Sequence, residues 1–412
     1  MTDVGAASVP LRRASRVRVV LATRIFTPDS AAAAFRLQAL VDALAKRGAA
    51  VEVLTTQSSA STLISDPSGP VVVRRWPVRR DSDGYVRGYL PYLSFDAPLV
   101  LRLLATVRPD VIVVEPPPTT GAVVRAVSAV RSVLTRRPVP YVYYAADVWS
   151  DASASTGAPP PVVAVLRALE RYALRGARDV IAVSDGVAER VRDLGARVVH
   201  VVPNGIDTQT FAQLDPQPET TRSSSRTRDI PSGPFLVYAG TASEWQGAEV
   251  FAEAMRLVLA EVPQARLVFL GQGSSWPALQ RIADELPDGA IELRQVAPVW
   301  AAAAWQRAAS AALVSVKPGL GYDFAYPTKV LAALACGTRV VYAGPGPAAA
   351  DLTEQGLGDA VPYDVDAVAA AMVRALRADP DASAAQRRAM WVQQHRSVRA
   401  TGAAAADIVL DT

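Results

Sequence analysis

The feature that most constrains the fold of this chain is a regular alternation of short β-branched runs with longer segments of helical periodicity. From residue 16 onward the first such run is VRVVLA (17–22), and VEVLTT (51–56) and DVIVVE (110–115) follow. Such an order is typical of parallel sheets whose strands are joined by helices lying on both faces. The sequence therefore predicts an α/β fold.

The alternation occurs in two series, separated by a stretch without periodicity. That stretch is dense in Ser, Thr, Arg and Pro, as in a linker or surface loop. A chain of 412 residues also exceeds what one hydrophobic core usually supports. We predict two doubly wound, Rossmann-like domains that face each other across a cleft. The predicted parts are a disordered N-terminus (1–15), a first domain (16–205), the linker (206–234), a second domain (235–382) and a C-terminal helical segment that packs back on the first domain (383–412).

Composition excludes several classes of protein. Cys336 is the single cysteine, so an intramolecular disulfide is excluded and a reducing, cytoplasmic compartment is expected. No apolar run is long enough to span a bilayer, and no Lys/Arg stripe with stacking aromatics indicates nucleic acid. The acid patterns at 81–83 and 364–366 are typical of loops or helix starts, so no metal site is predicted. His200 lies among valines and is predicted to be a core residue.

Several loop sequences carry a family resemblance through their order along the chain. TPDSAAAAFRLQALVDALAKRGAAVEVLTT opens the first series, and IAVSDGVAERVRDLGARVVHVVPNGIDTQTF closes it. YAGTASEWQGAEVF, ARLVFLGQGS and ALVSVKPGLGYDFAYPTKVLAALACGTRVV follow in the second series. A fragment such as PNGID is by itself only a tight turn. In this order, from residue 17 to about 380, the fragments resemble family 4 glycosyltransferases, especially the bacterial branch that builds surface polysaccharides.

This resemblance implies the GT-B fold and a hexosyltransferase-like enzyme. Such an enzyme moves a sugar from a UDP- or dTDP-sugar donor to a glycan, a lipid-linked or a small-molecule acceptor. The resemblance further implies retention at the anomeric carbon, with neither a metal nor a cofactor. The sugar, the base and the acceptor depend on pocket shape, which the sequence does not reveal.

The donor side of such a reaction needs fixed positive charge, because a diphosphate leaves the sugar. Helix N-termini and a lysine supply it well. Two segments of the second domain qualify: the glycine turn of Gly240 and Thr241, and YPTKV, where Thr328 is expected to cap a helix. Lys329 would lie in the first turn of that helix, where a cation opposes the helix dipole unless an anion is bound. Lys329 is therefore the leading phosphate contact, against the alternative of a plain surface lysine, and Lys317 is the next candidate.

The acceptor side needs a carboxylate near a strand end. Asp147 follows the strand YVYYAA and occupies the place of the branch's D-x-W pattern. There it could accept the proton of the acceptor hydroxyl or orient the sugar. Its alternative role is an N-cap for the following segment. Glu115, beside a run of three prolines, is a second carboxylate at a strand end.

The chain departs from the family at an important point. Many members carry two glutamates eight positions apart, and aligning PTKVLAALACG puts Phe324 and Ala332 there; Gln246 also replaces a usual lysine. Neither Phe nor Ala can accept a hydrogen bond, and an unpaired ribose hydroxyl would cost about 1 kcal/mol or more. This sustains an alternative from another class: a noncatalytic GT-B pseudoenzyme that serves a partner transferase as an auxiliary subunit.

The segment RRWPVRR (74–80) gathers arginines around Trp76, with Arg87 and Tyr85 nearby. Family members that use lipid-linked acceptors touch the bilayer in this way, so peripheral contact with the inner face of the membrane is one expectation. A solvated loop is the other.

Overall fold

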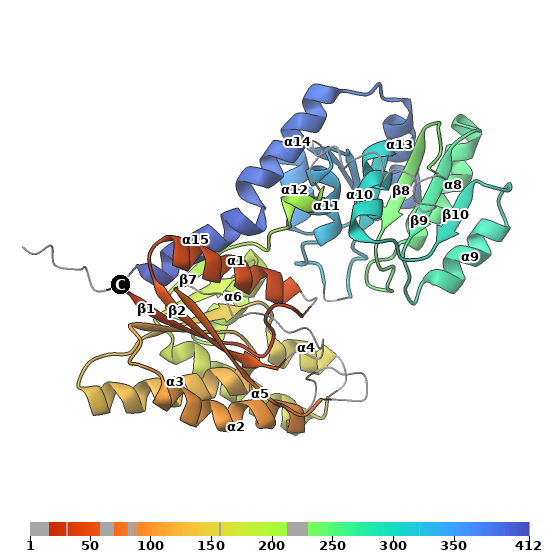
Figure 1. The fold of residues 1–412 in the computed structure, drawn as a ribbon. Helices are drawn as coiled ribbons and strands as arrows, with labels where there is room; N and C mark the ends of the chain where they lie inside the picture. Colours follow the sequence, from red (N-terminus) through yellow and green to blue (C-terminus); the bar gives the residue numbers. More distant parts are fainter. Residues whose placement is uncertain are drawn as a thin grey trace, which may run out of the picture. The chain divides into compact units, whose positions relative to one another are not determined.

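The computed structural model describes residues 16–29, 32–57, 70–80, 86, 89–155, 158–211, 230–320 and 322–411. The predicted N-terminus (1–15), most of the predicted linker, the acid pattern at 81–83, and Tyr85 and Arg87 lie outside the described residues. The described residues form two compact units (Figure 1). Unit 1 holds the chain up to Ile181, Val191–His200 and the residues from Gly402 on. Unit 2 holds Ala182–Arg190 and Val201–Thr401.

Unit 1 is built on a seven-stranded sheet in the order β3-β2-β1-β4-β5-β6-β7. The pairings from β3 through β5 are parallel, and Val19 of β1 lies between Val51 of β2 and Val111 of β4. Valines at these positions suit a sheet that is covered on both faces. The strands are β1 Arg18–Ala22, β2 Ala50–Thr56, β3 Val71–Trp76, β4 Val111–Val114, β5 Tyr141–Ala145, β6 Asp179–Ala182 and β7 Val199–Val201.

Helices cover both faces of this sheet, with α2, α3 and α5 in one layer and α1 and α15 on the opposite side (Figure 1). Leu37, Leu40 and Leu44 of α1 share one face and are fully buried. Gly402 of α15 approaches α1 so closely that a Cβ there would lie 2.6 Å from the Ala39 carbonyl carbon. The helices are α1 Ala32–Lys46, α2 Tyr89–Ala105, α3 Pro118–Thr135, α4 Trp149–Ser155, α5 Pro160–Gly176 and, from Gly402 on, α15 Val398–Leu410. Helix α6 Asp185–Asp193 belongs to unit 2 up to Arg190 and to unit 1 from Val191 on.

Unit 2 repeats the design with a six-stranded sheet in the order β10-β9-β8-β11-β12-β13, in which each pairing is parallel. Its strands are β8 Phe235–Ala239, β9 Arg266–Leu270, β10 Ile291–Arg294, β11 Ala311–Ser315, β12 Val340–Ala343 and β13 Gly358–Val361. Its helices are α7 Thr208–Phe211, α8 Glu249–Glu261, α9 Trp276–Asp284, α10 Val299–Ala308, α11 Thr328–Ala335, α12 Pro347–Glu354, α13 Val365–Arg377 and α14 Ala382–His395.

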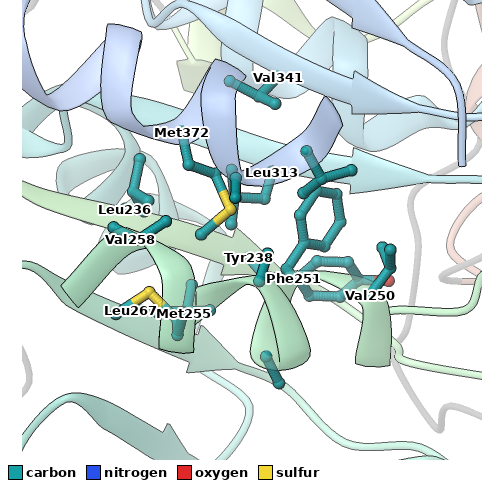
Figure 2. Packing of buried hydrophobic residues seen from close by; sticks show 14 of the residues in the cluster. Leu236, Tyr238, Val250, Phe251, Met255, Val258, Leu267, Leu313, Val341 and Met372 are labelled. Carbon is teal, nitrogen blue, oxygen red and sulfur yellow. The ribbon is translucent and has the colours of Figure 1, made fainter. Parts of the chain in front are cut away.

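The alternation of side chains along β8 feeds two separate cores. Leu236 and Tyr238 point into a cluster with Phe251 of α8 and Met372 of α13, shown in Figure 2. Phe235 and Val237 belong to the core on the opposite face, together with Trp305, Val330 and Leu334 from α10 and α11. Because both faces of the sheet are buried, α11 is fixed against the sheet by its apolar residues, and its N-terminus lies close to the strand ends.

Two features of the structure differ from prediction. His200 is not a core residue: its side chain is 40% exposed, and its Nε2 lies 3.0 Å from Asp179 Oδ1. Polar pairing with the neighbouring strand, which the valines around it do not indicate, explains the error. Of the predicted C-terminal segment, residues up to Thr401 lie in unit 2 and only those from Gly402 on lie in unit 1. In the part of the chain that the structure describes, no helix is both long and apolar enough to cross a membrane.

Candidate active site

The topology of unit 2 marks one place for a ligand. The order of the strands reverses between β8 and β11, so the connections that leave these two strands run to opposite sides. In open parallel sheets, ligands bind at such a switch point, beyond the carboxyl ends of the strands. Gly240 and Thr241 follow β8, and Lys317 follows β11 after one residue. Three of the residues predicted from sequence therefore lie at the switch point.

The side chain of Lys329 extends from α11 to this switch point and lies against Gly240, on the side to which a Cβ of residue 240 would point. Gly240 has a φ of +126°, and a Cβ at this position would lie 2.7 Å from Lys329 Cε. Any side chain at position 240 would therefore displace the lysine, in addition to straining the backbone. The Gly240 N–H donates to the Leu270 carbonyl over 2.8 Å, which holds the turn against β9.

The ammonium group of Lys329 is held in a half-buried position. Its Nζ lies 5.2 Å from the centroid of the Tyr238 ring, within range of a cation–π interaction. Burial lowers the pKa of Lys329 to about 8, because the charged form loses hydration. A cation that is partly desolvated at a helix N-terminus is stabilised by a bound anion, which supplies the missing counter-charge.

The predicted cap of α11 is wrong. Pro327 is the N-cap residue, with φ −66° and ψ 122°, and no side chain caps the helix. Thr328 is instead the first residue of the helix and is exposed. Proline takes this place readily because its fixed φ is compatible with entry into a helix. A first turn without a side-chain cap is the kind of helix start that suits a bound anion.

Lys317 and the loop after it form the rim of the same strand ends. Lys317 is exposed, and its backbone N–H donates to the Trp245 carbonyl over 2.9 Å. The Trp245 ring stacks on Tyr322, with ring centroids 4.8 Å apart and an interplanar angle of 25°. Thr241 is also exposed. These residues are open to a ligand, whereas Lys329 is held in place by its surroundings.

The residues that replace the family's usual polar groups provide no substitute for them. Phe324 is 50% exposed and Ala332 is buried in α11. Gln246 is buried, and its Oε1 accepts hydrogen bonds from both the N–H and the Oγ of Ser243, each 3.2 Å long. Gln246 therefore holds its own loop together.

Unit 1 has a second cluster of charged residues at its own switch point, between β1 and β4. Glu115 follows β4, is buried, and forms an ion pair with Arg36 of α1. Thr23, after β1, donates its Oγ1 hydrogen to Glu115 Oε2 over 3.1 Å. Because Glu115 is paired on both sides, it has the geometry of a positioning group.

Asp147 lies beyond the end of β5 and is exposed. Desolvation of the carboxylate raises the pKa of Asp147. The positive charge of Arg36 opposes this rise, and the negative charge of Glu115 adds to it. The N-cap alternative for Asp147 is wrong. The N–H groups of Trp149 and Ser150, at the start of α4, donate to the Glu170 carboxylate over 2.9 and 3.2 Å. Glu170 of α5 thus caps α4.

Sequence reasoning missed Arg24, which is 5% exposed. Its guanidinium lies 4.1 Å from the Tyr92 ring centroid and 5.5 Å from that of Trp149, and it donates to the Val86 carbonyl over 3.3 Å. Burial lowers the pKa of Arg24, and contact with Tyr92 opposes this. An arginine after a strand gives no local sign of burial, and its aromatic partners lie 68 and 125 positions away by residue number.

Comparisons with known proteins agree with this architecture. Residues 33–210 match the family described as Glycosyltransferase Family 4, and residues 233–378 match the glycosyl transferases group 1. A D-inositol 3-phosphate glycosyltransferase of Xylanimonas cellulosilytica is 30% identical over 194 residues, which cover 42% of this chain and 43% of that protein. The matching region thus spans less than half of the relative.

Solved structures cover nearly the whole chain. A sucrose-phosphate synthase from Thermosynechococcus elongatus superposes with a TM-score of 0.66 at 17% identity, over 95% of this chain and 98% of that one. HepE of Anabaena, solved in complex with UDP-glucose, gives a TM-score of 0.64 at 17% identity, over 96% of this chain and 100% of that one. At such identities the likeness shows the fold.

Proposed function

Because the chain belongs to the family 4-like glycosyltransferases of the GT-B fold, we propose that it transfers a sugar from a nucleotide-sugar donor to an acceptor hydroxyl. The observation that carries the proposal is the position of Lys329. Its ammonium lies at the uncapped start of α11, beneath Gly240, at the switch point of a parallel sheet. UDP- and dTDP-sugars are the donors we propose, and the similarity to HepE, which was solved in complex with UDP-glucose, supports the UDP type.

The charge on Lys329 suits a departing diphosphate. With a pKa of about 8, the ammonium is about 90% protonated at pH 7. The bond between the anomeric carbon and the diphosphate oxygen breaks in the reaction, and the electron pair stays with the phosphate. Lys329 and the first turn of α11 stabilise that charge by position, so we propose a reaction that needs no metal. Lys317 and Thr241 would contact the donor from the rim.

We propose Asp147 as the group that acts on the acceptor. The acceptor oxygen forms the new bond to the anomeric carbon, and its proton passes to a base. A raised pKa makes a carboxylate a better base at neutral pH, and Asp147 is exposed at a strand end where an acceptor can reach it. Retention of configuration is proposed from the family resemblance. The acceptor classes we propose are a glycan, a lipid-linked glycan and a small molecule.

Unit 1 has a surface that suits a lipid-linked acceptor. Apolar residues 90, 93, 97, 101 and 104 recur along α2 at helical spacing, and all of them are exposed. Leu93 is 60% exposed and Leu101 is 72% exposed. On the neighbouring helix α3, Val133 and Leu134 are 77% and 73% exposed. This surface is far more apolar than a solvated helix face usually is.

The exposed charges on the helices of this surface are positive. The acidic residues of α2, α3 and α5 are Asp96 and Glu170, both buried, whereas Arg171 and Arg175 of α5 are exposed. Arg102 of α2 connects the surface to the segment 74–80, because its Nη2 donates to the Arg74 carbonyl and its guanidinium lies 5.7 Å from the Trp76 ring. An apolar stripe bordered by arginines is typical of contact with an anionic membrane surface, so we propose peripheral binding there.

The alternative, a noncatalytic GT-B subunit, is supported by Phe324 and Ala332, which offer no polar side-chain atom to a ribose. Two measurements separate the alternatives. Millimolar UDP- or dTDP-sugars should raise the melting temperature of a catalytic protein, in proportion to the logarithm of ligand concentration over Kd. Lys329→Ala should reduce that shift more than Lys317→Ala. The absence of a shift across a broad nucleotide panel would reject the transferase, and binding without any hydrolysis or transfer product would favour the auxiliary subunit.

A further inference from the structure

The segment just before α11 is held by a network of three polar side chains that are distant in sequence. Tyr326 precedes the Pro327 N-cap, and its hydroxyl donates to Asp351 Oδ2 on α12 over 2.9 Å. Arg396, at the end of α14, donates a hydrogen bond of 2.6 Å from its Nη2 to the same oxygen. The Arg396 side chain is 15% exposed and that of Asp351 is 24% exposed, so the pair is largely shielded from solvent.

The network is packed as well as hydrogen-bonded. The Arg396 guanidinium lies 5.0 Å from the centroid of the Tyr326 ring, so the arginine contacts both the ring and the acid that its hydroxyl meets. Burial, followed by the charge of Asp351, raises the pKa of Tyr326 well above its ordinary value, so its hydroxyl remains a donor. Arg396 and Asp351 therefore fix the place at which the chain enters α11.

A second arginine of α14 holds the other end of α11. Arg388 Nη1 donates to the Gly337 carbonyl over 3.1 Å, just beyond the helix, and its Nε donates to the Leu357 carbonyl over 3.0 Å. Helices α11 and α14 pack against each other. One helix thus holds both ends of the helix that carries Lys329.

The C-terminal end of α14 is itself fixed within unit 2. The Arg396 carbonyl accepts a hydrogen bond from the Ile206 N–H over 2.8 Å, and the Val398 N–H donates to the Ile206 carbonyl over 2.9 Å. Gly205 lies so close to this segment that a Cβ there would be 2.6 Å from the Ser397 carbonyl carbon. Arg396 therefore projects from a backbone that is held on both sides.

We propose that Arg396 and Asp351 are positioning residues which, through Tyr326, hold the first turn of α11 so that the Lys329 ammonium stays beneath Gly240. This inference rests on the proposed function only where it treats the position of the Lys329 ammonium as an anion site. The geometry predicts that loss of the network lets α11 shift at its start, so that Lys329 leaves its half-buried position and becomes hydrated.

The test is the titration of Lys329 itself, which needs no donor. The chain has three lysines, at 46, 317 and 329, so ¹³Cε-lysine NMR resolves them, and Lys329→Arg identifies the signal. Wild type should titrate near pH 8. Arg396→Ala, Asp351→Ala and Tyr326→Phe should each raise the midpoint by about one pH unit, because burial alone depresses it. Arg396→Lys, which keeps a charged donor, should stay close to wild type.

The two charge-removing variants separate positioning from simple field effects. Loss of the Arg396 charge alone would raise the midpoint, whereas loss of the Asp351 charge alone would lower it. Opposite shifts would therefore overturn the proposal, as would an unchanged midpoint in folded Tyr326→Phe. The control is Arg377→Ala, which removes an arginine paired with Glu261 elsewhere in unit 2 and should leave the midpoint unchanged.

Donor binding gives a second, separable result. If UDP binds wild type, the three network variants should weaken it about tenfold, roughly the effect of one charge-assisted contact, while the control does not. If wild type binds no nucleotide, the proposed function fails, yet the titration still decides whether the network positions Lys329.

Discussion

Lys329 Cε lies where a side chain on Gly240 would have to go, since a Cβ at position 240 would be 2.7 Å from it. The two residues lie 89 positions apart in sequence and are brought together by the fold. We expect Gly240→Ala to displace the lysine and to weaken UDP binding about tenfold, as measured by calorimetry.

Backbone strain alone must be separated from that effect. Gly289 has a φ of +80° with nothing within 4 Å of its would-be Cβ, so Gly289→Ala imposes strain in open space. Both variants should lose about 1–2 kcal/mol of stability from the positive φ. A Gly240→Ala protein that binds UDP as tightly as Gly289→Ala does would show that Lys329 is not the contact.

The pH dependence of nucleotide binding should report Lys329. Its pKa is lowered by burial to about 8 from an ordinary 10.5, so its charge is present below pH 8 and is lost above it. Because UDP needs the charged form, affinity should fall about tenfold between pH 7 and pH 9. Lys329→Arg, which stays charged, should bind with a flat profile over this range.

Lys317→Arg is the matched control and should keep the wild-type slope, because Lys317 lies on the exposed rim. If Lys329→Arg showed the same slope as wild type, another group would be titrating. The free energy of unfolding changes with pH in the opposite direction to the affinity for UDP. Since the folded pKa is depressed, stability should rise with pH from about 8 toward the unfolded value.

Asp147→Asn should lower turnover about a hundredfold while leaving the affinity for the donor nucleotide unchanged. The amide cannot accept a proton but has nearly the same shape, so the loss should appear in kcat. Asp151→Asn on α4 is the control, since Asp151 pairs with Arg167 on the helix surface. Equal turnover in Asp147→Asn and wild type would remove Asp147 from the chemistry.

Binding to membranes should depend on the apolar stripe of α2. In flotation with phosphatidylglycerol vesicles, a double variant Leu93→Ser, Leu101→Ser should lose about tenfold in binding, because two exposed leucines no longer enter the interface. Leu257→Ser on α8 removes a leucine that is 43% exposed in unit 2, and it should bind like wild type. Equal binding to phosphatidylcholine vesicles and to anionic vesicles would contradict the role of the arginines.

The central strands of both sheets can be predicted from the sequence because they are buried and consist of continuous, largely β-branched runs. The strands β3, β10 and β13 are only partly buried and were not predicted. The place of Lys329 in the first turn of α11 was also predictable from sequence, whereas its role as the phosphate contact stays a prediction. The prediction that Thr328 caps α11 was wrong because Pro327 is the N-cap residue. The prediction relied on the preference of threonine for N-cap positions and gave too little weight to the proline before it. The local sequence thus predicted a side-chain cap where the helix has none.

What the sequence could not reveal are contacts between residues far apart along the chain. Glu170 caps a helix about 20 positions away, and Arg396 meets an acid 45 positions away. Neither glutamate nor arginine shows a local pattern that distinguishes such a role from a solvated surface position. These contacts depend on how helices pack on a completed sheet, so only the folded chain shows them.

The packing of Gly402 against Ala39 has a consequence for the order in which the two units fold during synthesis. Unit 1 takes residues from Gly402 on, which follow the whole of unit 2 in sequence, since unit 2 ends at Thr401. On the ribosome, the first unit to be translated would therefore be the last to close. A nascent chain halted before residue 402 would carry a completed second unit, while α1 would lack the contact of Ala39 with Gly402.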